Sequence, residues 1–196
     1  MSKPAGEKVS LADYYARSQT DRAWYFKNTI KIRPKNASLG LVPLEMRPGQ
    51  VKLMDAIDGA RKRGKPPRVI ILKARQIGFS TVTDMELLRC CHVFKHQQAL
   101  VVAHRTESTE ILFENIRRAW QAMPKAVQPK NKYSNKRMLH FAENDSRIEV
   151  SVAGETRGFT AQMLHVSELA FIEGAGSLMT AIMQTVPDTL ASLVVR

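Results

Sequence analysis

Short apolar runs alternate with longer amphipathic stretches over most of the chain. The runs are four or five residues long and read as buried strands, whereas the stretches between them carry the spacing of apolar residues that is typical of helices. Mainly apolar strands that alternate with helices favour a parallel sheet covered by helices on both faces. The predicted strands are 69–72, 99–103, 163–166 and 192–195, with shorter pieces at 138–141 and 148–152, and the predicted helices are 79–96, 106–123 and 176–186.

The N-terminal quarter of the chain has a different pattern. A helix is predicted from about residue 10 to 27, with Ser10 as its N-cap, followed by a Pro- and Gly-containing connector and a second helix over 48–62. We therefore divide the chain into a helical and extended lead-in over 1–46 and a main domain over 47–196. Because the chain stops at Arg196, where a strand has only begun, we expect that domain to be truncated at its C-terminal end.

Composition places the protein among intracellular globular domains. The chain has 196 residues, of which 44% are hydrophobic, and this is enough for one domain with a core. It contains no apolar run near 18 residues and no apolar signal core at its N-terminus, so we expect neither a membrane span nor secretion. Cys90 and Cys91 are adjacent, which suits neither a disulfide framework nor a zinc site.

The charge balance favours a polyanionic partner. The net charge is +12, from 30 basic and 18 acidic residues, and nucleic acid is the first partner that such an excess indicates. The basic residues cluster at 61–68 and at 125–137. Either cluster taken singly is equally consistent with a solvated loop. Our hypothesis is that 125–137 faces DNA.

The stretch that follows the first predicted strand has the layout of a phosphate-binding loop. In such loops backbone N–H groups and a helix N-terminus surround a phosphate. Gly78 and Ser80 match the second glycine and the hydroxyl of the pattern G-x-x-x-x-G-K-[ST], but Phe79 replaces the lysine and Lys73 stands where the first glycine belongs. A long side chain at Lys73 has the length to reach the same phosphates, and Ser80 offers a hydroxyl to Mg²⁺. The alternative is an ordinary strand-to-helix turn. The candidate nucleotide-binding residues are Lys73, Ala74, Arg75, Gln76, Ile77, Gly78, Phe79, Ser80 and Thr81.

A second motif ends the strand predicted at 163–166. Nucleotide hydrolases often end such a strand with Asp-Glu, the aspartate holding the water shell of Mg²⁺ and the glutamate polarising the attacking water. Here Ser167 replaces the aspartate and Glu168 keeps the position of the glutamate. Ser167 can hydrogen-bond a water on Mg²⁺ but adds no charge. The alternative is a helix-capping Ser-Glu pair, and His165, which interrupts the apolar run, is more often a packed core residue than a ligand.

Two further residues suit a nucleotide site. Gln50 follows Arg-Pro-Gly at the start of a predicted helix, and its amide has the donor and the acceptor that read an adenine edge. Arg157 stands between Gly154 and Gly158, where a loop arginine can neutralise charge on a γ-phosphate, and Arg75 is the rival for that role. The alternatives are a simple helix start for Gln50 and a solvated turn or a DNA-phosphate contact for Arg157.

Taken together, these motifs resemble the ATPase domain of the large terminase subunit of tailed bacteriophages. The resemblance is carried by Arg75-Gln76-x-Gly78-x-Ser80, a Walker A variant with its lysine at the head of the loop, by the segment from Leu100 to Ile116, and by Val166-Ser-Glu-Leu-Ala-Phe171, a Walker B variant. It runs from about Pro48 to Val194. It implies an α/β fold of the P-loop NTPase type (ASCE, RecA-like).

The resemblance also implies an activity and its partners. The expected cofactors are ATP and Mg²⁺, and the expected work is the translocation of double-stranded DNA into a procapsid, in a ring on the portal protein, with a small terminase subunit, in the host cytoplasm. On that reading Glu168 activates water and Arg157 serves a neighbouring subunit. The family's nuclease domain is absent, so no DNA cleavage is expected. Two alternatives stay open: a helicase-like ATPase acting on nucleic acid, and a nucleotide- or DNA-binding module without turnover, because Phe79 and Ser167 each remove a charge.

Overall fold

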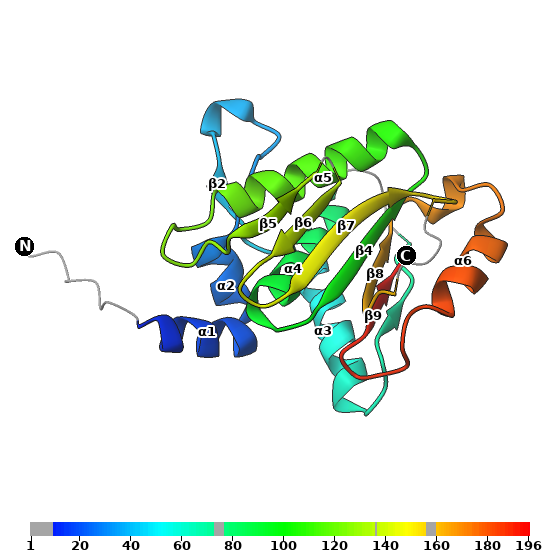
Figure 1. Ribbon diagram of the computed structural model, residues 1–196, viewed down its shortest axis with the longest axis horizontal. Helices are drawn as coiled ribbons and strands as arrows, with labels where there is room; N and C mark the ends of the chain where they lie inside the picture. The colour runs from blue at the N-terminus through cyan, green and yellow to red at the C-terminus, as the bar shows by residue number, and fades with distance from the viewer. Residues whose placement is uncertain (1–9, 73–76, 136, 156–159) are drawn as a thin grey trace, which may run out of the picture.

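The protein is built around one seven-stranded sheet. The structure, a computed structural model, describes residues 10–72, 77–135, 137–155 and 160–196 (Figure 1). Five neighbouring strands run parallel and the last two pairings are antiparallel, so that one strand alone runs against the rest and the predicted mainly parallel sheet is confirmed. In spatial order the strands are β3 (Arg68–Val69), β9 (Leu193–Val195), β8 (Met163–Val166), β4 (Gln98–Ala103), β7 (Ser146–Val152), β6 (Met138–Phe141) and β5 (Asn131–Ser134).

Helices cover the two faces of this sheet unequally. Ala99 and Val101 of β4 face a core shared with five helices, whereas Leu100 and Val102 face a second core with a single helix. The alternation follows from the two-residue period of a strand. Figure 1 shows the single helix, α6 (Ala175–Met183), standing apart from the others near the β9 end of the sheet. The helices of the first face are α1 (Leu11–Thr20), α2 (Arg22–Thr29), α3 (Pro48–Lys62), α4 (Phe79–Val93) and α5 (Thr106–Gln121).

The N-terminal segment differs from its prediction in two places. The helix expected from 10 to 27 is split at Asp21, whose side chain accepts a hydrogen bond from the Trp24 N–H and so starts α2. The expected connector contains a small antiparallel sheet, β1 (Lys31–Ile32) with β2 (Val42–Pro43), and a 3₁₀ turn, η1 (Ala37–Leu39). Buried Tyr14 and Phe26 belong to the first core, so the described part of the lead-in packs onto the main domain. The division at residue 46 stays a prediction.

The basic segment 125–137 also differs from its prediction. A loop was expected there, but β5 lies within the segment and pairs with β6, which in turn pairs with β7. Lys and Asn have low strand propensity, so the pairing with β6, rather than local preference, sets this strand. Within the described residues no helix has the length and apolar character needed to cross a membrane.

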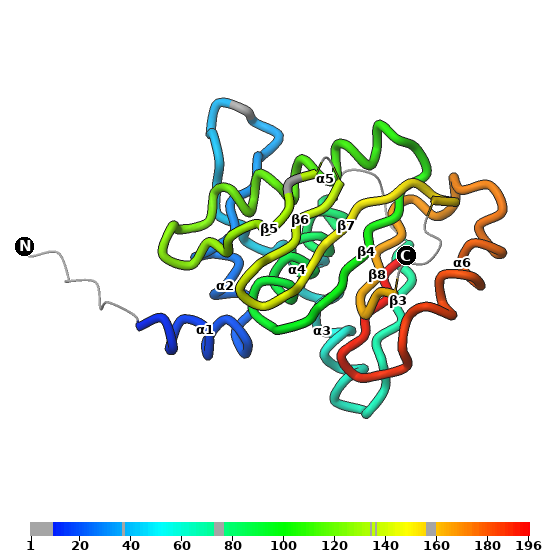
Figure 2. Tube along the Cα trace, in the orientation of Figure 1, coloured from blue at the N-terminus to red at the C-terminus, as the bar shows by residue number. Residues whose placement is uncertain are grey.

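The helix α4 is buried on all sides. It runs behind the sheet (Figure 2), and every residue from Val82 to Val93 is buried. Cys90 and Cys91 lie in this stretch as free thiols, and burial raises the pKa of Cys90 to about 11, which makes it a poor nucleophile. Four ionisable side chains are buried with them, and each has a partner on another element or within α4: Asp84, Glu86, Arg89 and His92.

Candidate active site

A cavity of about 580 Å³ opens where the parallel strands end. It lies between the first turns of α4 and the segment after β8, which forms the short turn η2 (Leu169–Phe171). Ser80 and Glu168, far apart in the sequence, both line it. The arrangement follows from the topology, because parallel strands bring their carboxyl ends to one edge of the sheet. The other lining residues are Ile70, Ile71, Leu72, Phe79, Thr83, His165, Val166, Leu169, Ala170, Phe171, Ala175, Val195 and Arg196.

Gly78 is the position from which α4 begins. Its φ of +80° is left-handed, which favours glycine, and a Cβ there would lie 2.8 Å from Nε2 of Gln50, so the Gln50 side chain would have to move. The Gln50 Nε2 donates to the Gly78 carbonyl at 2.8 Å, and the Gln50 Oε1 accepts from the Arg47 N–H at 2.9 Å. Gln50 therefore ties the start of α3 to the start of α4.

This bonding role of Gln50 was not part of the sequence-based prediction. The sequence signal for it is the capping box that begins at Arg47, in which a glutamine three residues later bonds back to the cap N–H. The adenine contact proposed for Gln50 stays a prediction. Gln50 lines a second cavity, of about 660 Å³, together with Gly78 and Thr81. The rest of its lining comes from the β1–β2 segment and the start of α3. Both cavities thus adjoin the start of α4, one lined by Phe79 and Ser80 and the other by Gly78 and Thr81.

The residue that replaces the usual lysine, Phe79, has a packing role. Its ring packs against the first core, and a Cβ on Gly49 of α3 would lie 3.4 Å from it. Ile77 is 36% exposed beside it. The predicted residues Lys73, Ala74, Arg75 and Gln76, and the candidate finger Arg157, lie outside the described residues, so their roles stay predictions.

Glu168 adopts a backbone conformation that is uncommon for a residue with a side chain. Its φ of 55° and ψ of 45° are left-handed, and such conformations cost about 1 to 3 kcal/mol and cluster at functional sites. Its carbonyl accepts from the Phe171 N–H, which closes η2. The side chain is 43% exposed, so water has access to its carboxyl group.

His104 is a site residue that the sequence reasoning missed. It directly follows β4, and its Nδ1 lies 3.5 Å from the Glu168 Oε2, an ion-pair distance without hydrogen-bond geometry. Nδ1 is buried without a hydrogen-bond partner, and the ring packs against Phe171 with centroids 5.9 Å apart. The available signal was its position at the carboxyl end of a predicted strand, the same edge that carries Glu168.

The described residues fit a magnesium-bound phosphate group. The first turn of α4 has backbone N–H groups without intrahelical partners, the usual cradle for an anion, and Ser80 places a hydroxyl in that turn. Thr83, one turn further, is 1% exposed and its Oγ1 has no hydrogen-bond partner although it lines the cavity. Ser167 is 8% exposed, with its N–H donating to the Val102 carbonyl at 2.8 Å.

The strand order and this edge of the sheet define an α/β fold of the P-loop NTPase type. No protein-family model matches the sequence, and no curated protein matches it. Solved structures do match. The large terminase of bacteriophage HK97 superposes with a TM-score of 0.69 at 16% identity, over 91% of this chain and 37% of that protein.

Two further phage structures agree. The large terminase ATPase domain of Thermus phage P74-26 gives a TM-score of 0.51 at 18% identity, over 84% of this chain and 69% of that one. The large terminase of another thermophilic bacteriophage gives a TM-score of 0.53 at 14% identity, over 74% of this chain and 37% of that one. The chain therefore shares the fold of phage large terminases, as its motifs led us to expect, and spans little more than a third of the HK97 protein.

Proposed function

We propose that this chain is the ATPase motor domain of a terminase large subunit, which hydrolyses ATP to move double-stranded DNA into a procapsid. The observation that carries the proposal is the meeting of Ser80 and Glu168 in one cavity, at the edge of the sheet where α4 begins. The fold shared with phage large terminases supports it. The matching structures described above are all phage large terminases, which favours this reading over the helicase-like alternative.

Each residue has a distinct role in the proposed reaction. The backbone of 73–80 and the start of α4 hold the phosphates, Lys73 neutralises their charge, and Gln50 faces the adenine from the second cavity. Glu168 accepts a proton from water as the water oxygen bonds to the γ-phosphorus, and the bond to the β-phosphate oxygen breaks to leave ADP and phosphate. Arg157, or Arg75, offsets the developing negative charge. Mg²⁺, which Ser80 and Ser167 would hold, supplies charge neutralisation when bound.

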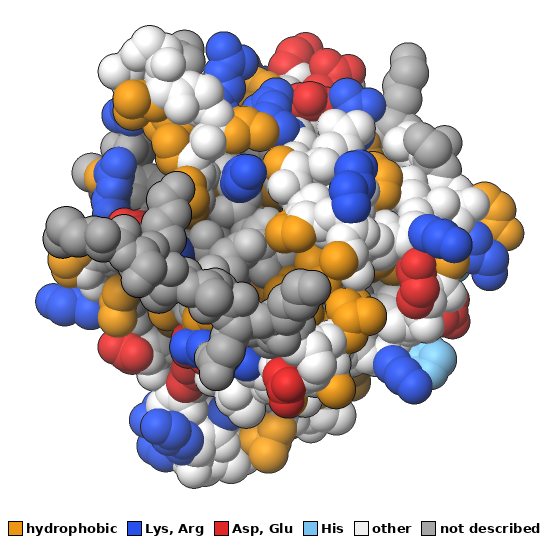
Figure 3. Space-filling view, turned by 90° about the vertical axis from the view of Figure 1, so that its left-hand side faces the viewer, with side chains coloured by type: hydrophobic (Ala, Val, Ile, Leu, Met, Phe, Trp, Pro, Cys, Tyr) orange, Lys and Arg blue, Asp and Glu red, His pale blue; other side chains and the backbone are white. Residues whose placement is uncertain are grey.

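The proposed partners follow from the same function. They are double-stranded DNA, the portal protein, a small terminase subunit and further copies of this chain in a ring, all in the host cytoplasm. On the face drawn in Figure 3, Lys and Arg are spread among acidic and apolar side chains, so this face does not single out one DNA-binding patch. Within 125–137, Arg137 is paired with Glu155 at 2.7 Å, whereas Lys130 and Lys132 are exposed. We therefore propose those two lysines as DNA contacts.

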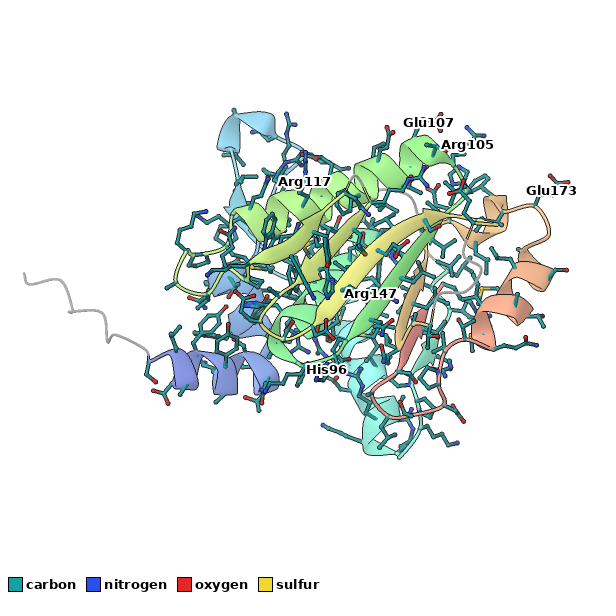
Figure 4. The ribbon with its side chains drawn as sticks, viewed as in Figure 1. His96, Arg105, Glu107, Arg117, Arg147 and Glu173 are labelled. Carbon is teal, nitrogen blue, oxygen red and sulfur yellow. The ribbon has the colours of Figure 1, made fainter. Side chains whose placement is uncertain are left out.

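The test of catalysis compares two glutamates on the same segment. Glu168→Gln keeps the shape of the side chain and removes the proton acceptor, so Mg²⁺-dependent ATP hydrolysis should fall by about 10² to 10⁴ while ATP binding persists. Glu173→Gln is the matched control, because Glu173 is exposed and points outward (Figure 4). Equal hydrolysis by the parent and by Glu168→Gln would remove Glu168 from the mechanism. ATP binding without turnover in the parent would instead favour the binding module.

The test of the DNA-binding lysines is a charge reversal. Changing Lys130 and Lys132 to Glu should weaken binding to double-stranded DNA and reduce the salt dependence of that binding by roughly one unit of slope for each phosphate that is no longer neutralised. Reversal of Lys52 and Lys62 on exposed α3 positions is the control. If the control pair weakens binding and the first pair does not, the DNA-binding surface lies on α3.

A further inference from the structure

A buried polar pair lies directly beneath the candidate active site. The His165 Nδ1 is 2.7 Å from the Asp84 Oδ1, and the two side chains are 5% and 1% exposed. The pair joins β8 to α4, the two elements whose ends carry Glu168 and Ser80. Thr83 lies beside Asp84 in the chain, and both Thr83 and His165 line the 580 Å³ cavity.

The pair is one layer below the residues assigned to magnesium. Thr83 and Asp84 follow Ser80 by three and four residues, which places them on the same face of α4, about 4 to 6 Å further along the helix. His165 lies in β8, and Ser167 comes two residues later, just past the end of the strand, where its N–H donates to the Val102 carbonyl. Ser80, Thr83 and Asp84 therefore share one face of α4, and the bond from Asp84 to His165 joins that face to β8 below the cavity.

Packing alone does not explain this pair. A buried ionisable pair is often no more stabilising than apolar side chains of the same volume. Met163, two residues before His165 on the same face of β8, is apolar and packs in the first core. The buried Thr83 hydroxyl has no hydrogen-bond partner among the described residues, and a buried hydroxyl without a partner costs free energy. A polar ligand in the cavity would satisfy it.

We propose that Asp84 and His165 are positioning residues for the magnesium–nucleotide complex, and that they take over the role of the acidic residue absent at position 167. This inference rests on the proposed ATPase function. When the His165 Nδ1–H donates to Asp84, its other ring nitrogen is left as a hydrogen-bond acceptor in a side chain that lines the cavity. That nitrogen and the Thr83 hydroxyl would accept hydrogen bonds from waters on a bound magnesium ion. Burial raises the pKa of Asp84, and its carboxylate, when ionised, favours the cation from one layer below.

The test measures metal binding rather than turnover. Mn²⁺ replaces Mg²⁺ in the ADP complex of the 196-residue chain, and bound Mn²⁺ is counted by electron paramagnetic resonance. Asp84→Asn removes the charge with little change of shape and should weaken Mn²⁺ binding about 10- to 100-fold, the usual effect of losing a partner behind a metal site. ADP affinity in EDTA should stay unchanged, because the pair is not assigned to the phosphates.

A buried hydrogen bond elsewhere on α4 provides the control. Tyr25→Phe removes the bond from the Tyr25 hydroxyl to the His92 Nδ1, which is 2.8 Å long and lies away from the cavity, and it should leave Mn²⁺ binding unchanged. If Asp84→Asn does not fold, Thr83→Val carries the test, because it removes only the unpartnered hydroxyl and should weaken Mn²⁺ binding several-fold.

The outcomes distinguish failure of this inference from failure of the proposed ATPase function. Unchanged Mn²⁺ affinity in folded Asp84→Asn or Thr83→Val, with a parent that binds Mn²⁺ and ADP, overturns the inference and leaves the proposed ATPase standing. An equal loss in Tyr25→Phe also overturns it, since the effect would then come from general loosening of α4. A parent that binds neither Mn²⁺ nor ADP overturns both.

Discussion

The helices α4 and α6 pack against opposite faces of the same sheet by different means. α4 is held by buried polar side chains with partners on other elements, whereas α6 contributes Met179 and Ile182 to an apolar core. Hydrogen bonds and ion pairs are directional, so they fix the rotation and the height of α4 against β8, while apolar contacts tolerate repacking. The more precisely held helix is the one whose first turn carries Ser80. The buried polar pairs of α4 therefore also fix the position of Ser80.

The largest expected effect comes from removing the charge at the centre of α4. Glu86 is fully buried and accepts hydrogen bonds from both Arg22 and Arg89. Burial alone would raise the pKa of Glu86, but the attraction of Arg89 and Arg22 lowers it to about 2, so the group is ionised at neutral pH. Glu86→Gln should lower the free energy of unfolding by about 3 to 5 kcal/mol in urea titrations, because buried Arg89 loses its counter-charge and Arg22 keeps only Asp58.

The same chemistry on the surface is the control. Glu114 of α5 also holds two arginines, Arg117 at 2.6 Å and Arg118 at 3.2 Å, but its side chain is 41% exposed. Glu114→Gln should therefore change the free energy of unfolding by no more than about 1 kcal/mol. Similar losses of unfolding free energy in Glu86→Gln and Glu114→Gln would show that burial of the ion pairs is not what distinguishes α4.

The second prediction uses pH to loosen the α4 face selectively. Burial lowers the pKa of His92 to about 4, against an ordinary value near 6.5. Between these two pH values the ring is protonated in the unfolded chain and neutral in the folded chain. Stability contributed by the neutral ring is therefore complete above pH 6.5 and is lost as pH falls to about 4, by about 3 kcal/mol. Urea titrations at pH 7, 6, 5 and 4 would measure this slope.

His92→Gln supplies the comparison for that slope. The variant is expected to be less stable at pH 7, since the Tyr25 hydroxyl loses its partner, but its stability should fall less steeply between pH 6.5 and 4. Further loss below pH 4.5, from the lowered pKa of Glu86, should remain in both proteins. An unchanged slope in the variant would assign the acid sensitivity to other groups.

The third prediction concerns the α6 face. Ile182 is 2% exposed in the apolar core that contains Leu164 and Val194. Ile182→Ala should lower the free energy of unfolding by about 2 to 3 kcal/mol through lost burial and a cavity, at the lower end of the usual range because an apolar contact can relax. The loss should be the same at pH 7 and at pH 5. A pH-dependent loss would mean that α6 is also coupled to the buried charges.

Much of the fold could be predicted because burial leaves a pattern along the chain. The runs at 99–103 and 163–166 are mainly apolar because both faces of their strands are covered, and the parallel order then brings Ser80 and Glu168 to one edge. The break at Asp21 and the strand β5 were missed, because each is decided by one hydrogen bond or by a neighbouring strand rather than by periodicity. Local preference is a weak guide there.

The site was less predictable than the fold for a related reason. The motif gave Gly78 its place in a loop, but the bond from Gln50 to its carbonyl joins residues of two helices. The proximity of His104 to Glu168 likewise exists only in the folded sheet. The all-round burial of α4 was hidden, because Asp84, Glu86 and Arg89 read as surface residues until their partners are known. Pairing, not composition, makes them core residues.

The smallest expected effect on stability separates the two constraints on Gly78. Ala at a left-handed position costs about 1 to 2 kcal/mol, and Gly64→Ala gives that cost by itself, since φ there is +69° with no atom within 4 Å of the added Cβ. Gly78→Ala adds the clash with the Gln50 nitrogen at 2.8 Å, so it should cost more than Gly64→Ala and should also weaken ADP binding, which Gly64→Ala should not. In a Gln50→Ala background the excess should vanish, because the clashing atom is gone. An excess that persists there would mean that the backbone at Gly78 is fixed by contacts other than Gln50, and the tie between α3 and the start of α4 would lose its proposed importance.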